Sequence, residues 1–424
     1  MERSFTGVVA PNLTENESSA LKPGPMIQIT MSLIRRQRTE ILQLVFREGE
    51  VSEEIGRYFG SVILFSGTYN MMYNDILFEL IRTSLNKDSY IDDEVLNDVD
   101  WDEVINITSA QGLSDIAFDG LEKAVKYNPE YKNKIPKPLL LQWCGQVVHQ
   151  TSLFKKNWSA ACSLALLLNE HDIEAVVLKG RSIANYYPIP EHRYSCDLDL
   201  YVAGADWEHA CEILETKGIR LEREVYKEVE FIYDGLYVEM HRYITPVRGN
   251  KTLLRFERYL RNLLEDYPKT YFEGTSLLCP PLMFTVMLFI EHSLGDLLHG
   301  KLTLKHVVDW VVLRKQDINR EELESRCEEF RFDRFLPLMD ALADTVEGKV
   351  EIESLEPSHR ELMVSFFTLP KTAKSKDSWF ARRVSLFFDI IRNRRYYKRF
   401  GYCSMERFLL SAVWAHFFDK DVRL

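Results

Sequence analysis

The sequence lacks the cysteine spacings of a disulfide-bonded or zinc-binding protein. Its 7 cysteines are odd in number and widely scattered, and no Cys-x-x-Cys or Cys/His ligand spacing occurs. Disulfide frameworks and structural zinc sites both need regularly spaced ligands. We therefore expect reduced thiols, as in a cytoplasmic protein, and discount zinc.

The sequence also lacks a surplus of positive charge. Its 53 basic residues are outnumbered by 64 acidic ones, which gives a formal charge of −11. This balance is typical of an ordinary acidic protein and does not indicate nucleic-acid binding. The basic run 392–399, with its interleaved tyrosines, could contact phosphate-rich ligands or nucleic acid. A solvated helix face is the favoured interpretation of that run.

Long apolar runs are missing as well. Residues 1–30 contain no basic segment followed by an apolar one. The most continuous apolar run, Leu282–Ile290, is far too short to span a bilayer. We expect a soluble, cytoplasmic protein without a membrane partner.

What the sequence does have is length. With 424 residues, of which 46% are hydrophobic, the chain is long enough for two or three domains. Residues 1–25 are rich in Ser, Asn, Glu, Thr and Pro and are expected to be disordered. Helical patterns fill 26–170, an α/β core is predicted over 171–250, and helical patterns return over 251–424. The predicted fold class is α+β, with a small mixed β-sheet between two predominantly helical regions.

The periodicity of apolar residues predicts the individual elements. In the N-terminal region, helices are expected from Asp100 onward, over 116–127 and over 139–169. In the core, strands are expected over 173–178, 197–202, 219–227, 228–233 and 236–244, with a helix over 205–217. Asp234-Gly235 is a hairpin turn signal. C-terminal helices are expected over 252–266, 281–299, 303–315, 319–328, 331–345, 357–367, 378–396 and 404–418.

Three carboxylates in the core indicate a metal site. Asp197 and Asp199 are two residues apart on an expected strand, so their side chains point to the same face. Adjacent carboxylates repel each other unless a cation lies between them, and hard divalent cations prefer carboxylate oxygen. Glu239, on a later strand, presents a third acid. Together the acids predict two-metal phosphoryl-transfer chemistry, in which Asp197 and Asp199 hold the ions and Glu239 completes the site.

Residues before and after the acids suit an anionic phosphate. The turn Lys179-Gly180-Arg181-Ser182 is expected to open a helix, where backbone N–H groups favour phosphate. Lys179, Arg181 and Arg193 add positive charge, and Ser182 adds a hydroxyl. His241 shares a strand face with Glu239. It either orients that acid or touches substrate, or it is an ordinary hydrogen-bonded structural histidine.

Taken in order, these motifs resemble the signature of the uncharacterised nucleotidyltransferase family, a branch of the DNA polymerase beta-type nucleotidyltransferase superfamily. The resemblance covers about 100–315. It is carried by Leu178-Lys179-Gly180, Tyr187-Pro188-Ile189-Pro190, Arg193, Asp197-Leu198-Asp199, Val238-Glu239-Met240-His241, His292 and Leu302–Trp310. A site role for His292, and a bond from Asp309 across to the core, stay open beside ordinary packing.

The resemblance implies a polymerase-beta-like sheet, two Mg²⁺ ions that Mn²⁺ could replace, and a nucleoside triphosphate as substrate. A nucleoside monophosphate would pass to an unspecified small-molecule or protein acceptor, releasing pyrophosphate. By match, Asp197, Asp199 and Glu239 would bind metal, and Gly180 and Ser182 would line the phosphates. The superfamily's turn is usually Gly-Ser or Gly-Gly, and here Arg181 intervenes. A catalytically inactive nucleotide- or partner-binding module is therefore the alternative interpretation.

Overall fold

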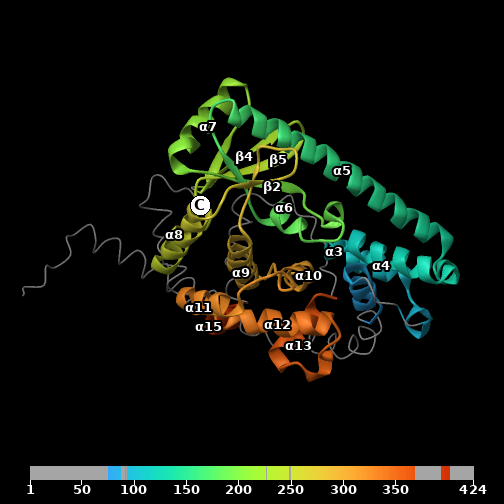
Figure 1. The fold of residues 1–424 in the computed structure, drawn as a ribbon. Helices are drawn as coiled ribbons and strands as arrows, with labels where there is room; N and C mark the ends of the chain where they lie inside the picture. The colour runs from blue at the N-terminus through green and yellow to red at the C-terminus, as the bar shows by residue number, and fades with distance from the viewer. Residues whose placement is uncertain are drawn as a thin grey trace, which may run out of the picture. The chain divides into compact units, whose positions relative to one another are not determined.

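A seven-stranded mixed sheet is present in this computed structural model, and its strands β2, β4 and β5 are labelled in Figure 1. The structure describes residues 75–86, 91, 93–225, 227–247, 250–367 and 393–401, all within a unit that spans Tyr69–Leu424. The prediction of disorder over 1–25 lies outside these residues, as does the predicted helix 404–418 and most of the predicted helix 378–396.

The order of strands in the sheet is β3-β4-β5-β2-β1-β7-β6. The strands are β1 (Ala175–Val177), β2 (Asp197–Val202), β3 (Glu222–Val225), β4 (Glu228–Tyr233), β5 (Leu236–His241), β6 (Thr270–Tyr271) and β7 (Leu278–Cys279). The central strand β2 runs parallel to β5 and antiparallel to β1, while β4 and β5 form a hairpin. The sheet is thus mixed and its helices are numerous, which confirms the predicted α+β class.

Helices precede, interrupt and follow the sheet. Before it come a helical segment over 75–85, η1 (Asp93–Leu96), α3 (Trp101–Ala110), α4 (Ser114–Tyr127), η2 (Pro129–Lys134) and α5 (Lys137–Asn169). Between the strands lie α6 (Lys179–Ala184), η3 (Pro190–His192) and α7 (Gly204–Thr216). After them come α8 (Lys251–Asp266), α9 (Leu282–His299), α10 (Leu304–Leu313), α11 (Arg320–Phe330), α12 (Phe335–Val346), η4 (Ile352–Ser354), α13 (Pro357–Ser365) and α15 (Arg394–Phe400).

One expectation about the sheet was wrong. We predicted only helices after residue 250, yet β6 and β7 extend the sheet beyond β1. Val176 of β1 is in parallel register with Leu278 of β7. Each of these two strands has only two residues, too few for the alternation of polar and apolar residues that identifies a strand. The chain therefore returns to the sheet after α8 before it becomes helical again.

The two faces of the sheet have separate apolar cores. Leu198, Leu200 and Val238 face the C-terminal half of α5, where they meet residues such as Leu164 and Leu168. Tyr201 and Val176 belong instead to the core formed with α8 and α9. Because side chains alternate along a strand, Asp197 and Asp199 share the face of Tyr201. The acids therefore lie on the side of the sheet that the C-terminal helices cover.

The helix α9 is central to that second core. By length and apolar composition it could cross a membrane, but 67% of it is buried inside the protein, the pattern of a core helix. The helix continues to His299, beyond the apolar run Leu282–Ile290. The six cysteines in the described part of the chain are free thiols, as predicted.

Candidate active site

Two acids and a histidine meet on the neighbouring strands β2 and β5. Asp199 and Glu239 are direct partners in the parallel register of these strands. One ligand atom from each of Asp199, Glu239 and His241 lies within 4.8 Å of the others. Asp199 and His241 are buried, whereas Glu239 is partly exposed. The arrangement offers two carboxylates and an imidazole to one small space.

Asp197 lies apart from this group. It begins β2 opposite Tyr237, and its Oδ1 accepts a hydrogen bond of 3.2 Å from the hydroxyl of Ser195. The side chain is partly exposed. The structure thus places Asp197 on the same face as Asp199 but at the rim of the cluster of Asp199, Glu239 and His241.

The ammonium group of Lys179 lies among the acids. Its Nζ donates to Asp199 Oδ1 at 2.7 Å and lies 3.9 Å from Glu239 Oε2. Burial alone would lower the pKa of Lys179, but the charge of Asp199 and the hydrogen bond to it outweigh burial and raise this pKa. Lys179 also has a φ of 47°, a left-handed conformation that is uncommon for a residue other than glycine. The chain thus turns sharply from β1 into α6 and places this amine against the carboxylates.

His241 connects the cluster to a further acid, Glu228. Its Nε2 lies 2.9 Å from Asp199 Oδ1, and its Nδ1 lies 2.9 Å from Glu228 Oε2. Burial of Glu228 is outweighed by its hydrogen bond to His241 and by the charge of Lys227, so its pKa falls to about 2. The Asp234-Gly235 hairpin could have revealed Glu228, because counting back from the turn places it directly opposite His241. His241 therefore contacts Asp199 and Glu228. Glu239 is farther from it, at 3.7 Å.

The two central acids differ in electrostatic state. Burial opposes ionisation of Asp199, but Lys179 and His241 hold its pKa well below the usual range. Burial and the charge of Asp199 raise the pKa of Glu239 to about 7. At neutral pH Asp199 is therefore ionised and Glu239 is partly protonated, so the pair carries less than two full negative charges. The single positive charge of Lys179 stabilises only the charge of Asp199.

Comparison with known proteins identifies the family. Residues 97–346 match the family described as Uncharacterised nucleotidyltransferase. The chain belongs to this nucleotidyltransferase family. Its matched region runs from just before α3 to the end of α12, so it includes the acids, Lys179 and the whole sheet. No curated protein matches the chain.

The glycine turn at 179–182 is tightly packed by neighbouring side chains and by its own backbone. A Cβ on Gly180 would lie 2.7 Å from Arg193 Nη1 and 2.7 Å from Ser195 Oγ, so any other residue would force these side chains to shift. The hydroxyl of Ser182 is buried and donates to the backbone carbonyl of Lys179 at 2.8 Å. Ser182, which we expected to contact phosphate, thus closes the turn in this structure.

Arg193, the second residue expected to bind phosphate, also has an internal partner. Its guanidinium is buried and forms two hydrogen bonds, of 3.0 and 2.6 Å, with Asp309 of α10. The hydroxyl of Tyr187 donates a third hydrogen bond, of 2.6 Å, to the carboxylate of Asp309. The bond from Asp309 to the core, which the sequence left open, therefore exists, and Arg193 fastens the loop before β2 to the C-terminal helices.

Arg181, which lies between Gly180 and Ser182, packs against α5. It is only 4% exposed, and its guanidinium carbon lies 3.8 Å from the ring centre of Phe154 and 5.8 Å from that of Trp158. Burial and the nearby Arg193 lower its pKa to about 10. Arg181 therefore packs α6 against α5 and is not part of the cluster of Asp199, Glu239 and His241.

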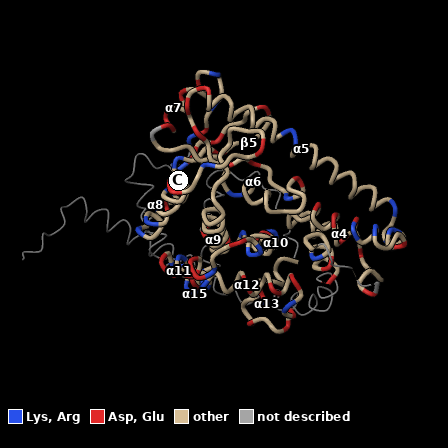
Figure 2. The backbone as a smooth tube through the Cα atoms, in the orientation of Figure 1, with Lys and Arg blue, Asp and Glu red and all other residues tan. Residues whose placement is uncertain are grey.

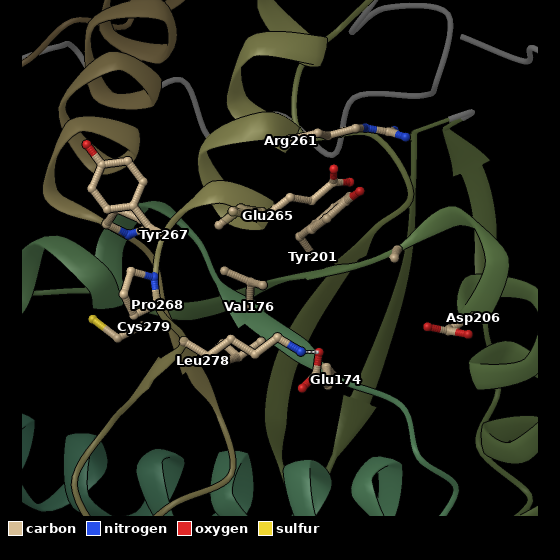
Figure 3. Close-up of a pocket in the computed structure, with 14 residues that line it drawn as sticks. Glu174, Val176, Tyr201, Asp206, Arg261, Glu265, Tyr267, Pro268, Leu278 and Cys279 are labelled. Carbon is tan, nitrogen blue, oxygen red and sulfur yellow. Dashed lines mark hydrogen bonds and ion pairs between the residues drawn. The ribbon is translucent and has the colours of Figure 1, made fainter.

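A pocket lies next to the acids on the same face of the sheet (Figure 3). It has a volume of about 240 Å³, and Tyr201, two residues past Asp199, forms part of its wall. Arg261 and Glu265 of α8 line it (Figure 3), and two further lining residues, Lys269 and Glu174, form an ion pair of 2.5 Å. The acids of the cluster do not line it, so it is a neighbour of the candidate active site and not part of it.

Two of the four described basic residues in the run 392–399 form ion pairs. Arg395 lies 2.7 Å from Glu361 of α13, and Arg399 lies 2.7 Å from Glu356, which is the N-cap residue of that helix. Figure 2 shows Lys and Arg interspersed with Asp and Glu along the chain. These pairs favour the interpretation of α15 as a helix face that packs and is solvated.

Proposed function

We propose that this nucleotidyltransferase moves a nucleoside monophosphate from a nucleoside triphosphate to an acceptor hydroxyl in a magnesium-dependent reaction. The oxygen of the acceptor forms a bond to the α-phosphorus, the bond between that phosphorus and the bridging oxygen breaks, and pyrophosphate leaves. The hydroxyl proton passes to solvent. The observation that carries the proposal is the convergence of Asp199, Glu239 and His241 within 4.8 Å.

The residues of the cluster fit a divalent cation. Asp199 and Glu239 supply hard carboxylate oxygens, and Asp197 supplies another at the rim. The cluster already holds a cation, since the Lys179 ammonium lies 2.7 Å from Asp199, which shows that positive charge is stabilised there. When bound, Mg²⁺ would neutralise the triphosphate and increase the acidity of the acceptor hydroxyl. Mn²⁺ has the same preference for carboxylate oxygen and would substitute for it.

The protein's own side chains then have distinct tasks. His241, fixed by Glu228 on one side, holds Asp199 in place. Lys179 is within reach of any anion that binds at the acids, so it would pair with a phosphate oxygen of the substrate. Arg193 and Ser182 act indirectly, by holding the loop and the turn that position Asp197 and Lys179.

The test combines binding and turnover on the full chain. Isothermal calorimetry should show nucleoside triphosphate binding that requires Mg²⁺, and an acceptor mixture should release pyrophosphate. Asp199→Ala should abolish both, whereas Asp102→Ala on the exposed surface of α3 should change neither. The proposal fails if an Asp197→Ala/Asp199→Ala double variant binds metal and nucleotide as the parent does.

A second candidate is a catalytically silent module that binds a nucleotide or a partner. The position of Lys179 favours it, because an ammonium that lies 2.7 Å from Asp199 and 3.9 Å from Glu239 competes with a metal ion for both acids. In a silent module, the parent would bind nucleotide equally well with and without Mg²⁺. Pyrophosphate release that depends on Asp199 would exclude this candidate.

A further inference from the structure

A polar pocket of about 340 Å³ lies between the α3–α4 turn, α5 and the loop that leads into β2. Its side chains are one carboxyl, two amides, two hydroxyls and one phenol ring, from Asp115, Gln146, Gln150, Ser109, Ser114 and Tyr194. We propose that this pocket binds the acceptor and that the acceptor is a neutral, polyhydroxylated molecule of monosaccharide size. The inference rests on the proposed function, because an acceptor has meaning only if transfer occurs.

The pocket lies close to the acids along the chain. Tyr194 precedes Asp197 by three residues, and an extended chain covers at most about 3.6 Å per residue, so their Cα atoms are within about 11 Å of each other. Ser195, between them, is hydrogen-bonded to Asp197. Burial and the charges of Cys196, Asp197 and Asp115 raise the pKa of Tyr194, so its phenol lies near both the pocket carboxyl and Asp197. We infer that a hydroxyl on a ligand held against Tyr194 reaches Asp197, at the rim of the acid cluster.

The wall formed by the α3–α4 turn is anchored on two sides. The amide of Gln111 donates to the carbonyl of Phe366 at 2.7 Å and accepts from the backbone N–H of Leu304 at 2.8 Å. Gly112 has a φ of 66°, and a Cβ there would lie 3.3 Å from Lys305 and 3.7 Å from Tyr194. The turn thus packs directly against the loop before β2, which keeps this wall of the pocket in place.

Hydrogen bonds join α5 and the loop before β2 to α4 and to each other. Trp143 of α5 donates to the hydroxyl of Ser114 at 2.9 Å. His192, at the end of η3, lies 2.8 Å from Asp119 of α4 and 3.1 Å from Thr151 of α5. The pocket is therefore preformed, as expected of a small-molecule site.

The side chains select a polyol over a charged ligand. Asp115 is 4% exposed, and its Oδ2 has no hydrogen-bond partner among the described residues. Gln146 and Gln150 are one helical turn apart, so both amides face the same way and offer donors and acceptors to adjacent hydroxyls. The ring of Tyr194 gives an apolar surface for the C–H groups of a sugar. Burial raises the pKa of Asp115 to about 7, so this carboxyl can both donate and accept hydrogen bonds to hydroxyls. Lys305, 5.8 Å from the ring centre of Tyr194, balances the charge of Asp115 when that carboxyl is ionised, which leaves the pocket without a surplus of either sign.

Sugar binding to the full chain tests the proposal. Saturation-transfer NMR with glucose, galactose, N-acetylglucosamine and myo-inositol, with and without Mg·ATP, should show saturable binding of at least one. Gln150→Leu and Asp115→Asn should each weaken that binding by about tenfold, the effect of losing one good hydrogen bond. Gln142→Leu, also on α5 but exposed and outside the pocket, should bind as the parent does.

The outcomes separate the acceptor proposal from the proposed function. Calorimetry of Mg·ATP on the same samples should be unchanged in all three variants. If no sugar binds, or if Gln150→Leu binds sugar like the parent while Mg·ATP still binds, the acceptor assignment is overturned and the transferase proposal stands. If sugars bind but none of the magnesium complexes of ATP, GTP, CTP and UTP does, the proposed function fails, and the assignment of the pocket to an acceptor falls with it.

Discussion

The guanidinium of Arg193 and the carboxylate of Asp309 form a buried, two-pronged ion pair. Nε donates to Oδ1 at 3.0 Å and Nη2 donates to Oδ2 at 2.6 Å, although the residues are 116 positions apart in the sequence. Arg193 belongs to the loop before β2 and Asp309 to α10. The pair therefore joins the strand that carries the acids to the helices that cover it.

Breaking this pair should destabilise the protein strongly. Asp309→Ala leaves a buried guanidinium without its counter-charge, so we expect the free energy of unfolding to fall by about 3–5 kcal/mol. Urea denaturation followed by tryptophan fluorescence measures the change. Lys126→Ala, which removes an exposed ion pair with Glu122, should cost about 0.5 kcal/mol or less. A loss that small for Asp309→Ala would show that the pair does not join the two regions.

Two glycine-to-alanine substitutions should have opposite effects. Gly180→Ala places a Cβ 2.7 Å from a guanidinium that Asp309 holds fixed, so it should lower both the melting temperature and nucleotide affinity. Gly145→Ala on α5 meets no atom within 4 Å and should stabilise the helix by about 0.5–1 kcal/mol. Calorimetric melting of both variants is the measurement. Equal effects would contradict the tight packing of the turn.

Removing the amine of Lys179 should affect metal and nucleotide in opposite directions. Lys179→Met frees Asp199 of a cation 2.7 Å away, so Mn²⁺ should bind more tightly in the absence of nucleotide. The affinity for the triphosphate should fall by about tenfold or more, because a charge-assisted contact to phosphate is lost. Electron paramagnetic resonance measures free Mn²⁺, and Lys217→Met on the exposed end of α7 is the control. Weaker Mn²⁺ binding in Lys179→Met would argue against competition between the amine and the metal.

Stability should depend on pH through Glu291 of α9. Burial raises the pKa of this carboxyl from 4.5 to about 7, with Lys227 and Lys179 opposing the effect. The folded state therefore binds a proton more tightly than the unfolded chain does. That contribution to stability is complete below pH 4.5 and is lost as the pH rises through 7.

Glu291→Gln should remove this dependence. Between pH 5 and pH 8, the variant should gain stability over the parent by on the order of 2–3 kcal/mol. Melting curves across that range give the difference, and Glu328→Gln on the exposed face of α11 should show none. A constant difference between Glu291→Gln and the parent would mean that Glu291 does not titrate in this window.

The acids could be placed from sequence because local rules determine them. Alternation along a strand puts Asp197 and Asp199 on one face, and the Asp234-Gly235 turn sets the register that brings Glu228 opposite His241. Glu239 was expected on a later strand as a third acid, and the structure shows that this strand, β5, lies beside β2, where Asp199 pairs with Glu239. Strand periodicity therefore predicts the face on which each acid lies, and the hairpin turn predicts the register of β4 and β5, but the pairing of β2 with β5 is a long-range contact.

The rest depends on contacts between distant segments. Nothing in the local sequence shows that Arg181 lies on Phe154, that Arg193 pairs with Asp309, or that Ser182 bonds to its own turn. A basic residue near a glycine turn is equally compatible with phosphate binding and with internal packing. The choice depends on which helix covers the turn, and that is a tertiary property.

Contacts along α5 fix the direction in which each face of this long helix points. Its 33 residues extend for about 50 Å. Its C-terminal half packs on the sheet, Phe154 supports Arg181 in the middle, and Gln146 and Gln150 line the polar pocket. Inserting one residue between Gln150 and Phe154 would turn the amides by about 100° away from the pocket without touching either end, whereas seven residues would nearly restore their direction. The length of this helix between its two anchor points is therefore constrained in whole turns, which gives the polar pocket a fixed orientation toward the acids.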